Sequence, residues 1–444
     1  MMKTLHPRWR VRRTPALLAV LMVLFLTAPG GSAQDGDSEA WVGTWATAPV
    51  VLLPPDQRPA TPRGPEPIHI NDQTLRQIVH TSVGGSGIRV ALTNLFGSEP
   101  LEVGAAHVAL RAGDGPHIVA DDDGALRFGG RSAVTIPSGE TVLSDPIELD
   151  VPALVDVAID LYLPGDPSND RATYHAAALT TSYVSSAGNH TGATEFPVET
   201  SLQNWFYLSA VHVLAPVDTP VVVTLGDSIT DGTASTPDTN SRWPDFLARR
   251  LNGDGHSGTG VLNAGIAGNR VLADNMGLGR LLGGDPNAPP PDPNALFGPS
   301  ALSRLDRDVL AQPGVTHVIV LESTNDIGMA FDAETPTVEE LIAGHTELVE
   351  RAHDRGLTIW GGTLVPFEGA FYFRDVGETK RQAFNEWIRT SGVYDAVIDF
   401  DAAVRDAGQP NRFVESYQSG DWLHPSDEGY RMMAEAIDLV LLSR

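Results

Sequence analysis

The first half of the chain, from about Trp41 to Pro216, alternates apolar and polar residues with a period of two. The clearest run is VDVAIDLYL, in which every second residue from Val155 to Leu163 is apolar while Asp156 and Asp160 fall between them. Turn residues such as VGGSG and RAGDGP separate these runs at distances typical of hairpins. Short strands punctuated by Gly and Pro indicate an antiparallel β-sandwich, of jelly-roll type, over residues 40–216. We expect no helix in this half.

The pattern changes after APVDTP, a plausible linker at 215–220. Short apolar runs now alternate with segments of helical period, which predicts an α/β domain over 219–444 with a parallel sheet covered by helices on both faces. The predicted strands are 221–225, 260–264, 317–321, 358–364 and 397–400, and the predicted helices are 243–251, 338–356, 379–392 and 426–443.

One segment, residues 272–300, breaks this alternation. Its Pro and Gly content forbids regular structure over most of its length. Loops of this length are usually functional lids or disordered segments, and the sequence favours neither.

Residues 1–33 have the features of a signal peptide. Five basic residues precede the apolar stretch ALLAVLMVLFLTAP, and small residues end the segment at Ala33. The alternative is an uncleaved anchor helix, but the apolar run is short for a membrane span. We therefore expect a secreted protein, extracellular or periplasmic, after cleavage of the leader.

Charge and composition narrow the possible partners. The chain has 30 basic and 56 acidic residues, and the predicted leader carries five of the basic ones and none of the acidic ones. Such a surface repels nucleic acid and anionic lipid. The chain has no Cys, which excludes disulfides, thiolate metal sites and a cysteine nucleophile. Beyond the leader no apolar run is long enough to span a membrane, and nothing specifies the oligomeric state.

Two polar side chains follow predicted strands of the second half, Ser228 after 221–225 and Asn325 after 317–321. Ligand sites of parallel sheets form at the carboxyl ends of the strands. A serine hydroxyl becomes a nucleophile when a His, itself held by a carboxylate, removes its proton. GDWLHP supplies Asp421 and, three residues later, His424, which a turn would place on the same side. These three residues predict a catalytic triad, which needs no metal or cofactor.

Acyl transfer also needs donors for the oxygen that becomes negative in the transition state. The backbone N–H of Ser228 is one candidate. Gly268, in NAGIAGNR, lacks a side chain and so allows a second backbone N–H to approach closely. The side-chain amide of Asn325 is the third candidate.

The motifs GDSIT (226–230), AGNR (267–270), STND (323–326) and DWLHP (421–425) resemble the four blocks of the SGNH, or GDSL, hydrolase superfamily, in its order and with compatible spacing. The resemblance implies a flavodoxin-like three-layer domain and ester hydrolysis. It assigns Ser228 as nucleophile, Asp421 and His424 as its triad partners, and Gly268 and Asn325 as oxyanion donors. The first half, with WVGTWATAP, resembles a two-domain secreted subgroup of arylesterase-like or acylhydrolase enzymes similar to esterases of xylan degradation.

One departure concerns the third block, which usually begins with Gly where this chain has Ser323. If the position requires a positive φ or close packing, Ser323 adds strain or narrows the pocket. The expected substrates are small-molecule or polysaccharide esters, with acetyl or other short acyl groups on carbohydrate or aryl alcohols.

Three alternatives stay open. Asp and Ser favour helix N-caps, so GDS could be purely structural. The chain could be a carbohydrate-binding protein with a degenerate hydrolase domain, Ser323 marking the decay. It could also be a metal-dependent phosphoesterase, since AGNH occurs at 187–190, although Ile229 stands where that chemistry needs a His. His317, His345 and His353 are interpreted as packing or solvated residues.

Overall fold

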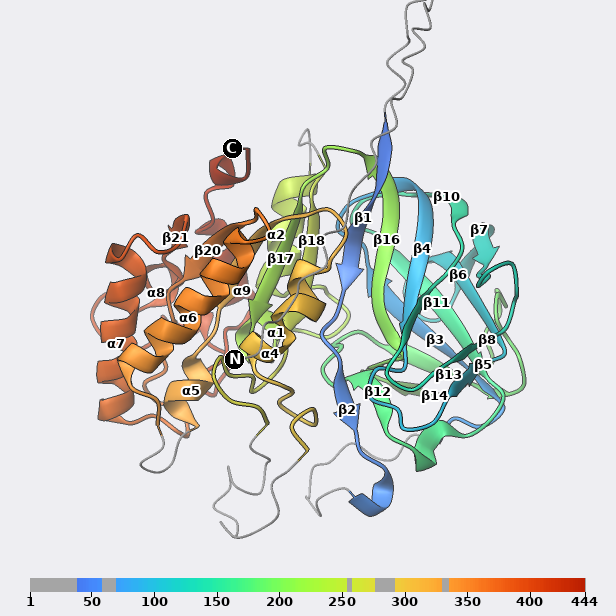
Figure 1. Ribbon diagram of the computed structural model, residues 1–444, viewed down its shortest axis with the longest axis horizontal. Coiled ribbons are helices and arrows are strands. Elements are labelled where there is room, and N and C mark those ends of the chain that lie inside the picture. The colour runs from blue at the N-terminus through green and yellow to red at the C-terminus, as the bar shows by residue number, and fades with distance from the viewer. Residues whose placement is uncertain (1–37, 58–68, 254–257, 276–291, 330–334, 444) are drawn as a thin grey trace, which may run out of the picture. The chain divides into compact units, whose positions relative to one another are not determined.

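The computed structural model describes residues 38–57, 69–253, 258–275, 292–329 and 335–443 (Figure 1). The predicted leader 1–33 lies outside the described residues, as does 276–291 within the predicted loop. Glu39–Arg444 forms one compact unit. Within the described part of the chain, no helix is both long enough and apolar enough to cross a bilayer.

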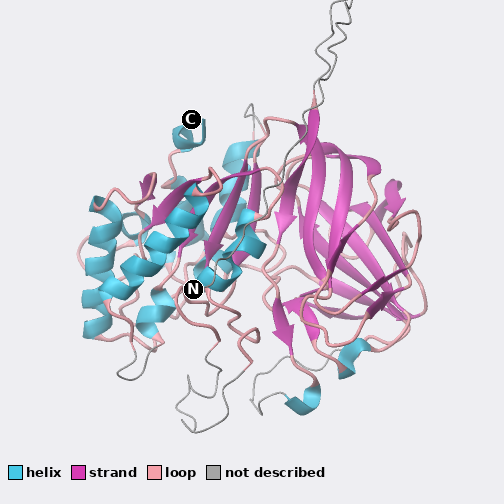
Figure 2. Ribbon diagram, in the orientation of Figure 1, coloured by secondary structure: helices cyan, strands magenta, loops and turns pink. Residues whose placement is uncertain are grey.

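The N-terminal half consists mainly of antiparallel sheets, consistent with the predicted sandwich (Figure 2). One sheet has the order β1 (Glu39–Ala46), β16 (Leu208–Pro216), β4 (Gly85–Thr93), β10 (Ile147–Val151), with β9 (Thr141–Leu143) also paired to β4. A second has the order β14 (Val198–Leu202), β13 (Ser182–Ala187), β3 (Gln73–His80), β11 (Asp156–Leu163), β6 (Ala105–Arg111), β7 (Ile118–Ala125). Two smaller sheets are β15 (Trp205–Phe206), β12 (Ala172–His175), β2 (Val50–Leu52), and β5 (Leu101–Val103), β8 (Val134–Ile136).

The run that indicated alternation is strand β11, and it is buried on both faces. Val157, Ile159 and Leu161 are fully buried, as the pattern predicts. Asp160, expected on the polar face, is also buried, because Arg76 donates to its two carboxylate oxygens at 2.7 Å each. The pairing of the two charges makes the burial of Asp160 tolerable. No helix was expected in this half, and among its described residues the helices are two short 3-10 turns, at 55–57 and 167–169.

The C-terminal half contains the predicted parallel sheet. Its order is β18 (Gly260–Gly265), β17 (Val221–Gly226), β19 (Val315–Leu321), β20 (Thr358–Gly362), β21 (Ala396–Ile398). Numbered along this half the order is 2-1-3-4-5, which is the flavodoxin-like order. Every residue of β17 is buried, as an apolar run in a sheet covered on both faces requires.

Two groups of helices accompany the sheet (Figure 2). The first comprises α2 (Trp243–Asn252), α8 (Phe400–Val404) and α9 (Asp427–Glu435), with α2 against β18 and α9. The second comprises α4 (Ala301–Leu305), α6 (Val338–His353) and α7 (Asp375–Thr390), with α6 against β20, α4 and α7. Short helices α1 (Ser228–Asp231) and α5 (Thr324–Gly328) follow β17 and β19. These contacts agree with an SGNH hydrolase fold in this half.

The predicted last helix, 426–443, is wrong in its length. Helix α9 ends at Glu435, and a separate 3-10 helix spans Leu439–Ser443. Arg250, from α2, donates to the carbonyl oxygens of Ala434 and Ile437. Its guanidinium satisfies carbonyls that a continued helix would use, which allows the helix to end there.

The two halves are in direct contact. Strand β16 ends at Pro216 and β17 begins at Val221, on either side of the predicted linker. Strand β1 lies against β18, the Gly43 N–H donates to the Pro313 carbonyl at 3.0 Å, and the Val261 N–H donates to Ser82 Oγ at 2.9 Å. The edge strand β1 of the N-terminal half therefore lies against the edge strand β18 of the parallel sheet.

Candidate active site

Ser228 is the first residue of α1, directly after the turn that follows β17. Asp227 is the N-cap residue, and its Oδ1 accepts from the Ile229 N–H at 2.9 Å. A Cβ on Gly226 would lie 2.1 Å from Thr230 Oγ1 and 2.6 Å from the Leu321 carbonyl, so the tight turn requires glycine. Asp227 thus has the capping role that the structural alternative for GDS allowed, and the cap holds Ser228 at the switch point of the sheet.

Ser228, His424 and Asp421 form one chain of hydrogen bonds. His424 Nε2 lies 2.9 Å from Ser228 Oγ, and His424 Nδ1 lies 2.6 Å from Asp421 Oδ2. The other oxygen of Asp421 accepts from the backbone N–H groups of Leu423 and His424, at 2.9 Å each. Both triad contacts are within hydrogen-bonding distance without any movement of the loop.

The surroundings of Asp421 determine which ring nitrogen of a neutral His424 carries the hydrogen. Burial would raise the pKa of Asp421, but its hydrogen bonds with His424 and Leu423 outweigh this and hold the pKa far below its usual range. An ionised carboxylate only accepts, so His424 Nδ1 must carry the hydrogen that faces it. In a neutral ring, Nε2 then presents its lone pair to the Ser228 hydroxyl.

The two backbone N–H groups expected to bind the oxyanion belong to Ser228 and Gly268. In the described part of the chain, the N–H groups of Ser228 and Gly268 donate to no protein acceptor. Gly268 has φ +79°, and a Cβ there would lie 2.1 Å from Phe297 Cδ1. The position therefore demands glycine on two counts, its left-handed backbone and the close approach of an aromatic ring.

The amide of Asn325 is held in one orientation. Its Nδ2 donates to the Asn269 carbonyl at 3.0 Å and to Asp227 Oδ2 at 3.3 Å. Tyr372 donates its hydroxyl to Asn325 Oδ1 at 3.4 Å. The amide nitrogen thus faces the AGNR loop and the residue before Ser228. Tyr372 was not identified from the sequence, because no periodic pattern marks it.

Buried charges lie beneath the site. Arg304, fully buried, donates to the carbonyl oxygens of Gly226 at 3.1 Å and Ala264 at 2.6 Å, and to Asn269 Oδ1 at 2.9 Å. It ties together the ends of β17 and β18 and the AGNR loop. Burial raises the pKa of Asp227 to about 7. No sequence pattern marks Arg304, which lies on the short helix α4 outside the four motifs.

Ser323 occupies the position where the family usually has Gly, and its backbone has φ +94°. This left-handed conformation is strained for a residue with a Cβ. Its hydroxyl lies 2.8 Å from His345 Nε2, and His345 Nδ1 bonds to the Tyr394 hydroxyl. The side chain of Ser323 thus contacts the buried His345 of α6.

The residues that suggested a phosphoesterase do not converge. His190 Nε2 lies 3.2 Å from the Ala187 carbonyl, and Asn189 Oδ1 accepts from Thr191, so both side chains bond within their own loop. Among the described residues no group of three or more His, Cys, Asp or Glu could hold a metal ion.

This geometry places a hydrolase-like site on a flavodoxin-like sheet, and comparison with known proteins gives a family match for this part of the chain. Residues 224–432 match the GDSL-like Lipase/Acylhydrolase family. The resemblance of these residues to the SGNH, or GDSL, hydrolases is therefore confirmed. No curated protein matches the chain.

Solved structures with similarity to the chain cover about half of it. A protein of the lipolytic G-D-S-L family from Desulfitobacterium hafniense has 24% identity over 49% of this chain and 96% of its own, with a TM-score of 0.35. The M. smegmatis aryl esterase has 17% identity over 51% and 99%, with a TM-score of 0.37. An acetylxylan esterase from Geobacillus stearothermophilus has 20% identity over 49% and 91%, with a TM-score of 0.34.

Proposed function

We propose that the protein is a secreted serine esterase that hydrolyses carboxylic esters through an acyl-enzyme, with acetyl or other short acyl groups on carbohydrate or aryl alcohols as substrates. The observation that carries the proposal is the chain of hydrogen bonds from Asp421 through His424 to Ser228, at 2.6 and 2.9 Å. A degenerate site would have lost one of the three groups.

In the first half-reaction, Ser228 Oγ attacks the ester carbonyl carbon while His424 Nε2 takes the hydroxyl proton. The charged imidazole is stabilised by the carboxylate of Asp421. The carbonyl oxygen becomes an oxyanion, and the N–H groups of Ser228 and Gly268 donate to it. The amide of Asn325 donates to it as well once the oxyanion replaces Asp227 Oδ2 as the acceptor of its 3.3 Å hydrogen bond. Collapse of the intermediate expels the alcohol, which leaves with the proton from His424.

In the second half-reaction, His424 removes a proton from water, and the resulting hydroxide attacks the acyl carbon. A second oxyanion forms in the same place and collapses, breaking the bond to Ser228 Oγ. The carboxylic acid leaves and Ser228 recovers its proton. The donors of the oxyanion thus act twice in each turnover.

The proposal is tested with p-nitrophenyl esters of increasing acyl length and with acetyl-xylan, using wild type and Ser228→Ala. We expect turnover of the acetyl ester by wild type, undiminished by EDTA, and loss of at least about four orders of magnitude in Ser228→Ala. Near-normal turnover in Ser228→Ala would refute the nucleophile. Loss of activity with EDTA would favour the phosphoesterase, and sugar binding without turnover in wild type would favour the binding protein.

Secretion is tested separately. We expect expression of the full gene in a secreting host to release a protein that begins after Ala33, because the segment ends there with small residues. N-terminal sequencing of the released protein checks this. A protein retained in the membrane with residues 1–33 attached would instead support the anchor helix.

A further inference from the structure

Asp231 links the nucleophile's helix to the proposed oxyanion loop. It is the last residue of α1, the helix that begins at Ser228, and its side chain is buried. Its Oδ2 accepts from the N–H of Ala267, the residue before Gly268, at 3.0 Å. One carboxylate oxygen therefore fixes the peptide immediately before the proposed Gly268 donor.

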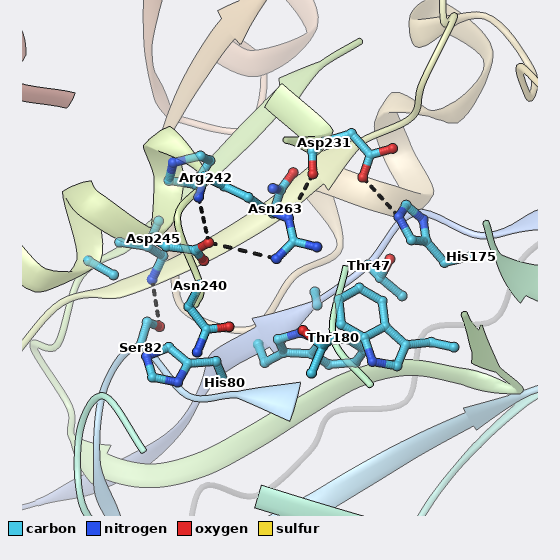
Figure 3. Close-up of a pocket in the computed structure, with 16 residues that line it drawn as sticks. Thr47, His80, Ser82, His175, Thr180, Asp231, Asn240, Arg242, Asp245 and Asn263 are labelled. Carbon is cyan, nitrogen blue, oxygen red and sulfur yellow. Dashed lines mark hydrogen bonds and ion pairs between the residues drawn. The ribbon is translucent and has the colours of Figure 1, made fainter. Parts of the chain in front are cut away.

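The other oxygen of Asp231 is held by a residue of the N-terminal half. His175, the last residue of β12, has its Nε2 at 2.9 Å from Asp231 Oδ1 (Figure 3). The side chains of the two residues are 5% and 4% exposed. The contact between His175 and Asp231 joins the two halves of the protein. Through Asp231 it reaches Ala267, the residue before the proposed oxyanion donor Gly268.

The hydrogen bonds of His175 indicate its charge. Its Nδ1 lies 2.9 Å from the Ala48 carbonyl oxygen, which only accepts, and Nε2 faces a carboxylate. Each ring nitrogen must therefore donate, so the ring is an imidazolium. Burial would lower the pKa of His175, but Asp231 and the hydrogen bond to Ala48 outweigh burial and the opposing charge of Arg242, and the pKa is raised.

Further contacts make this junction rigid. Arg242 Nε donates to the Asp231 carbonyl at 2.7 Å, and its Nη2 donates to the carbonyl of Ala178 in the N-terminal half. The ring of Trp205 lies 5.5 Å from that of His175, between centroids. Together with Asp231, the residues Arg242, His175 and Trp205 line a pocket between the halves (Figure 3). His175 and Arg242 therefore hold Asp231 in place, and Asp231 in turn holds the N–H of Ala267.

We propose that His175 is a positioning residue for ester hydrolysis: through Asp231 it holds the Ala267–Gly268 backbone so that the Gly268 N–H meets the oxyanion. This inference rests on the proposed function and adds a role for the N-terminal half. An oxyanion donor acts only where its position is fixed beforehand, and a displacement of about 1 Å can cost on the order of 100-fold in rate. The β-rich half would then complete the active site rather than only accompany it.

His80 provides a matched control. It lines the same pocket and also pairs with a carboxylate, its Nδ1 lying 2.7 Å from Asp156 Oδ1. Asp156 accepts further from Arg111, at 2.8 Å, and from Asn240 Nδ2, at 3.4 Å, and neither residue belongs to the oxyanion loop. The variants His175→Gln and His80→Gln therefore each remove a ring from a His–Asp pair at this pocket, and only the first acts on Asp231.

The test measures kcat and KM for p-nitrophenyl acetate and the affinity of an alkyl boronic acid in the full chain. The boron accepts an electron pair from Ser228 Oγ while the hydroxyl proton passes to His424, giving a tetrahedral anion that mimics the intermediate. For His175→Gln we expect kcat and boronate affinity to fall together by about 10- to 100-fold, with KM changed less than about 3-fold. For His80→Gln we expect changes under about 2-fold in all three.

Asp231→Asn is the second variant. His175 and Ala267 donate to different oxygens of Asp231, and Asn replaces one of these acceptors with an NH₂ donor, so we expect the same loss. Wild-type kcat and boronate affinity in folded His175→Gln would overturn the proposal, as would an equal loss in His80→Gln. If neither His175→Gln nor Asp231→Asn folds, the pair serves stability alone and the proposal is also overturned. Failure of the proposed function is distinct, because wild type would then show no turnover dependent on Ser228.

Discussion

His424 Nε2 and Ser228 Oγ lie 2.9 Å apart although 196 positions separate the two residues in the chain. Asp421, the second partner of the ring, is only three positions from His424. The fold of the sheet and α9 brings His424 to Ser228, whereas the turn before α9 brings Asp421 to His424.

Asp421→Asn should lower kcat for p-nitrophenyl acetate by about 10⁴-fold with little change in KM. The oxygen Oδ1 of Asp421 already accepts from two backbone N–H groups, so the amide NH₂ of Asn would face His424 Nδ1. The ring would then carry its hydrogen on Nε2 and could not accept the proton of Ser228. Asp427→Asn, on the adjacent helix α9, is the control, and an equal loss there would contradict the prediction.

Asn325→Ala should lower kcat by about two to three orders of magnitude if the amide is an oxyanion donor. Tyr372→Phe should cost less, about 2- to 10-fold, because it removes only the hydroxyl that donates to Asn325 Oδ1 at 3.4 Å. Steady-state kinetics and boronate affinity on both variants check this. A loss under tenfold in Asn325→Ala would remove Asn325 from that role.

Gly268→Ala should lower kcat by about 10- to 100-fold. The new methyl would lie 2.1 Å from Phe297 Cδ1 at a backbone φ of +79°, so the loop must move. Gly113→Ala is the control, since Gly113 has φ +64° with no atom within 4 Å of an added Cβ. Both variants should lose about 1 kcal/mol of stability from backbone strain, and only Gly268→Ala should lose turnover. Equal kinetics in the two would contradict the prediction.

Ser323→Ala and Ser323→Gly separate backbone strain from the contact with His345. Both lose the hydrogen bond to His345 Nε2, which should cost about 1–3 kcal/mol in the free energy of unfolding. Only Gly relieves the strain at φ +94°, so Ser323→Gly should be more stable than Ser323→Ala by about 1 kcal/mol. Denaturant unfolding measures the difference, and an order in which Ala is the more stable would contradict it.

The same contact bears on substrate size. Because the Ser323 hydroxyl bonds to His345 of α6, its removal should change stability more than acyl-chain preference. A profile over p-nitrophenyl esters of increasing chain length checks this. A preference for longer acyl groups in Ser323→Gly would instead support a narrowed pocket.

His345 should make the protein less stable in acid. Burial lowers the pKa of His345 to about 3, from an ordinary value of 6.5. Between these values the unfolded chain binds a proton that the folded protein excludes, so stability falls as pH falls below about 6.5. Relative to His345→Gln, wild type should lose about 3 kcal/mol between pH 7 and pH 4, as urea unfolding would show.

The control for that experiment is His353→Gln, on the same helix, where the side chain is 45% exposed. The stability of this variant should follow that of wild type with pH, because it keeps the buried His345. A pH-independent difference between wild type and His345→Gln would contradict a neutral, buried His345.

The amino-acid sequence by itself determined the elements and the local chemistry. Apolar runs such as 221–225 predicted the strands of the parallel sheet, because a strand buried on both faces shows in the sequence as a short run of apolar residues. Asp421 and His424 could be paired from their spacing, since three positions along a turn fix their separation. The glycine at 268 was likewise visible, because a close backbone approach itself imposes that residue type.

The tertiary structure alone decided which distant groups meet. His175 and Asp231, Ser323 and His345, and Arg304 with the strand ends are separated by tens of positions, and no periodicity relates one partner to the other. The end of α9 depends in the same way on Arg250. Local propensity and pattern extend only a few residues along the chain, whereas a buried charge finds its partner through packing, and packing is a property of the whole fold.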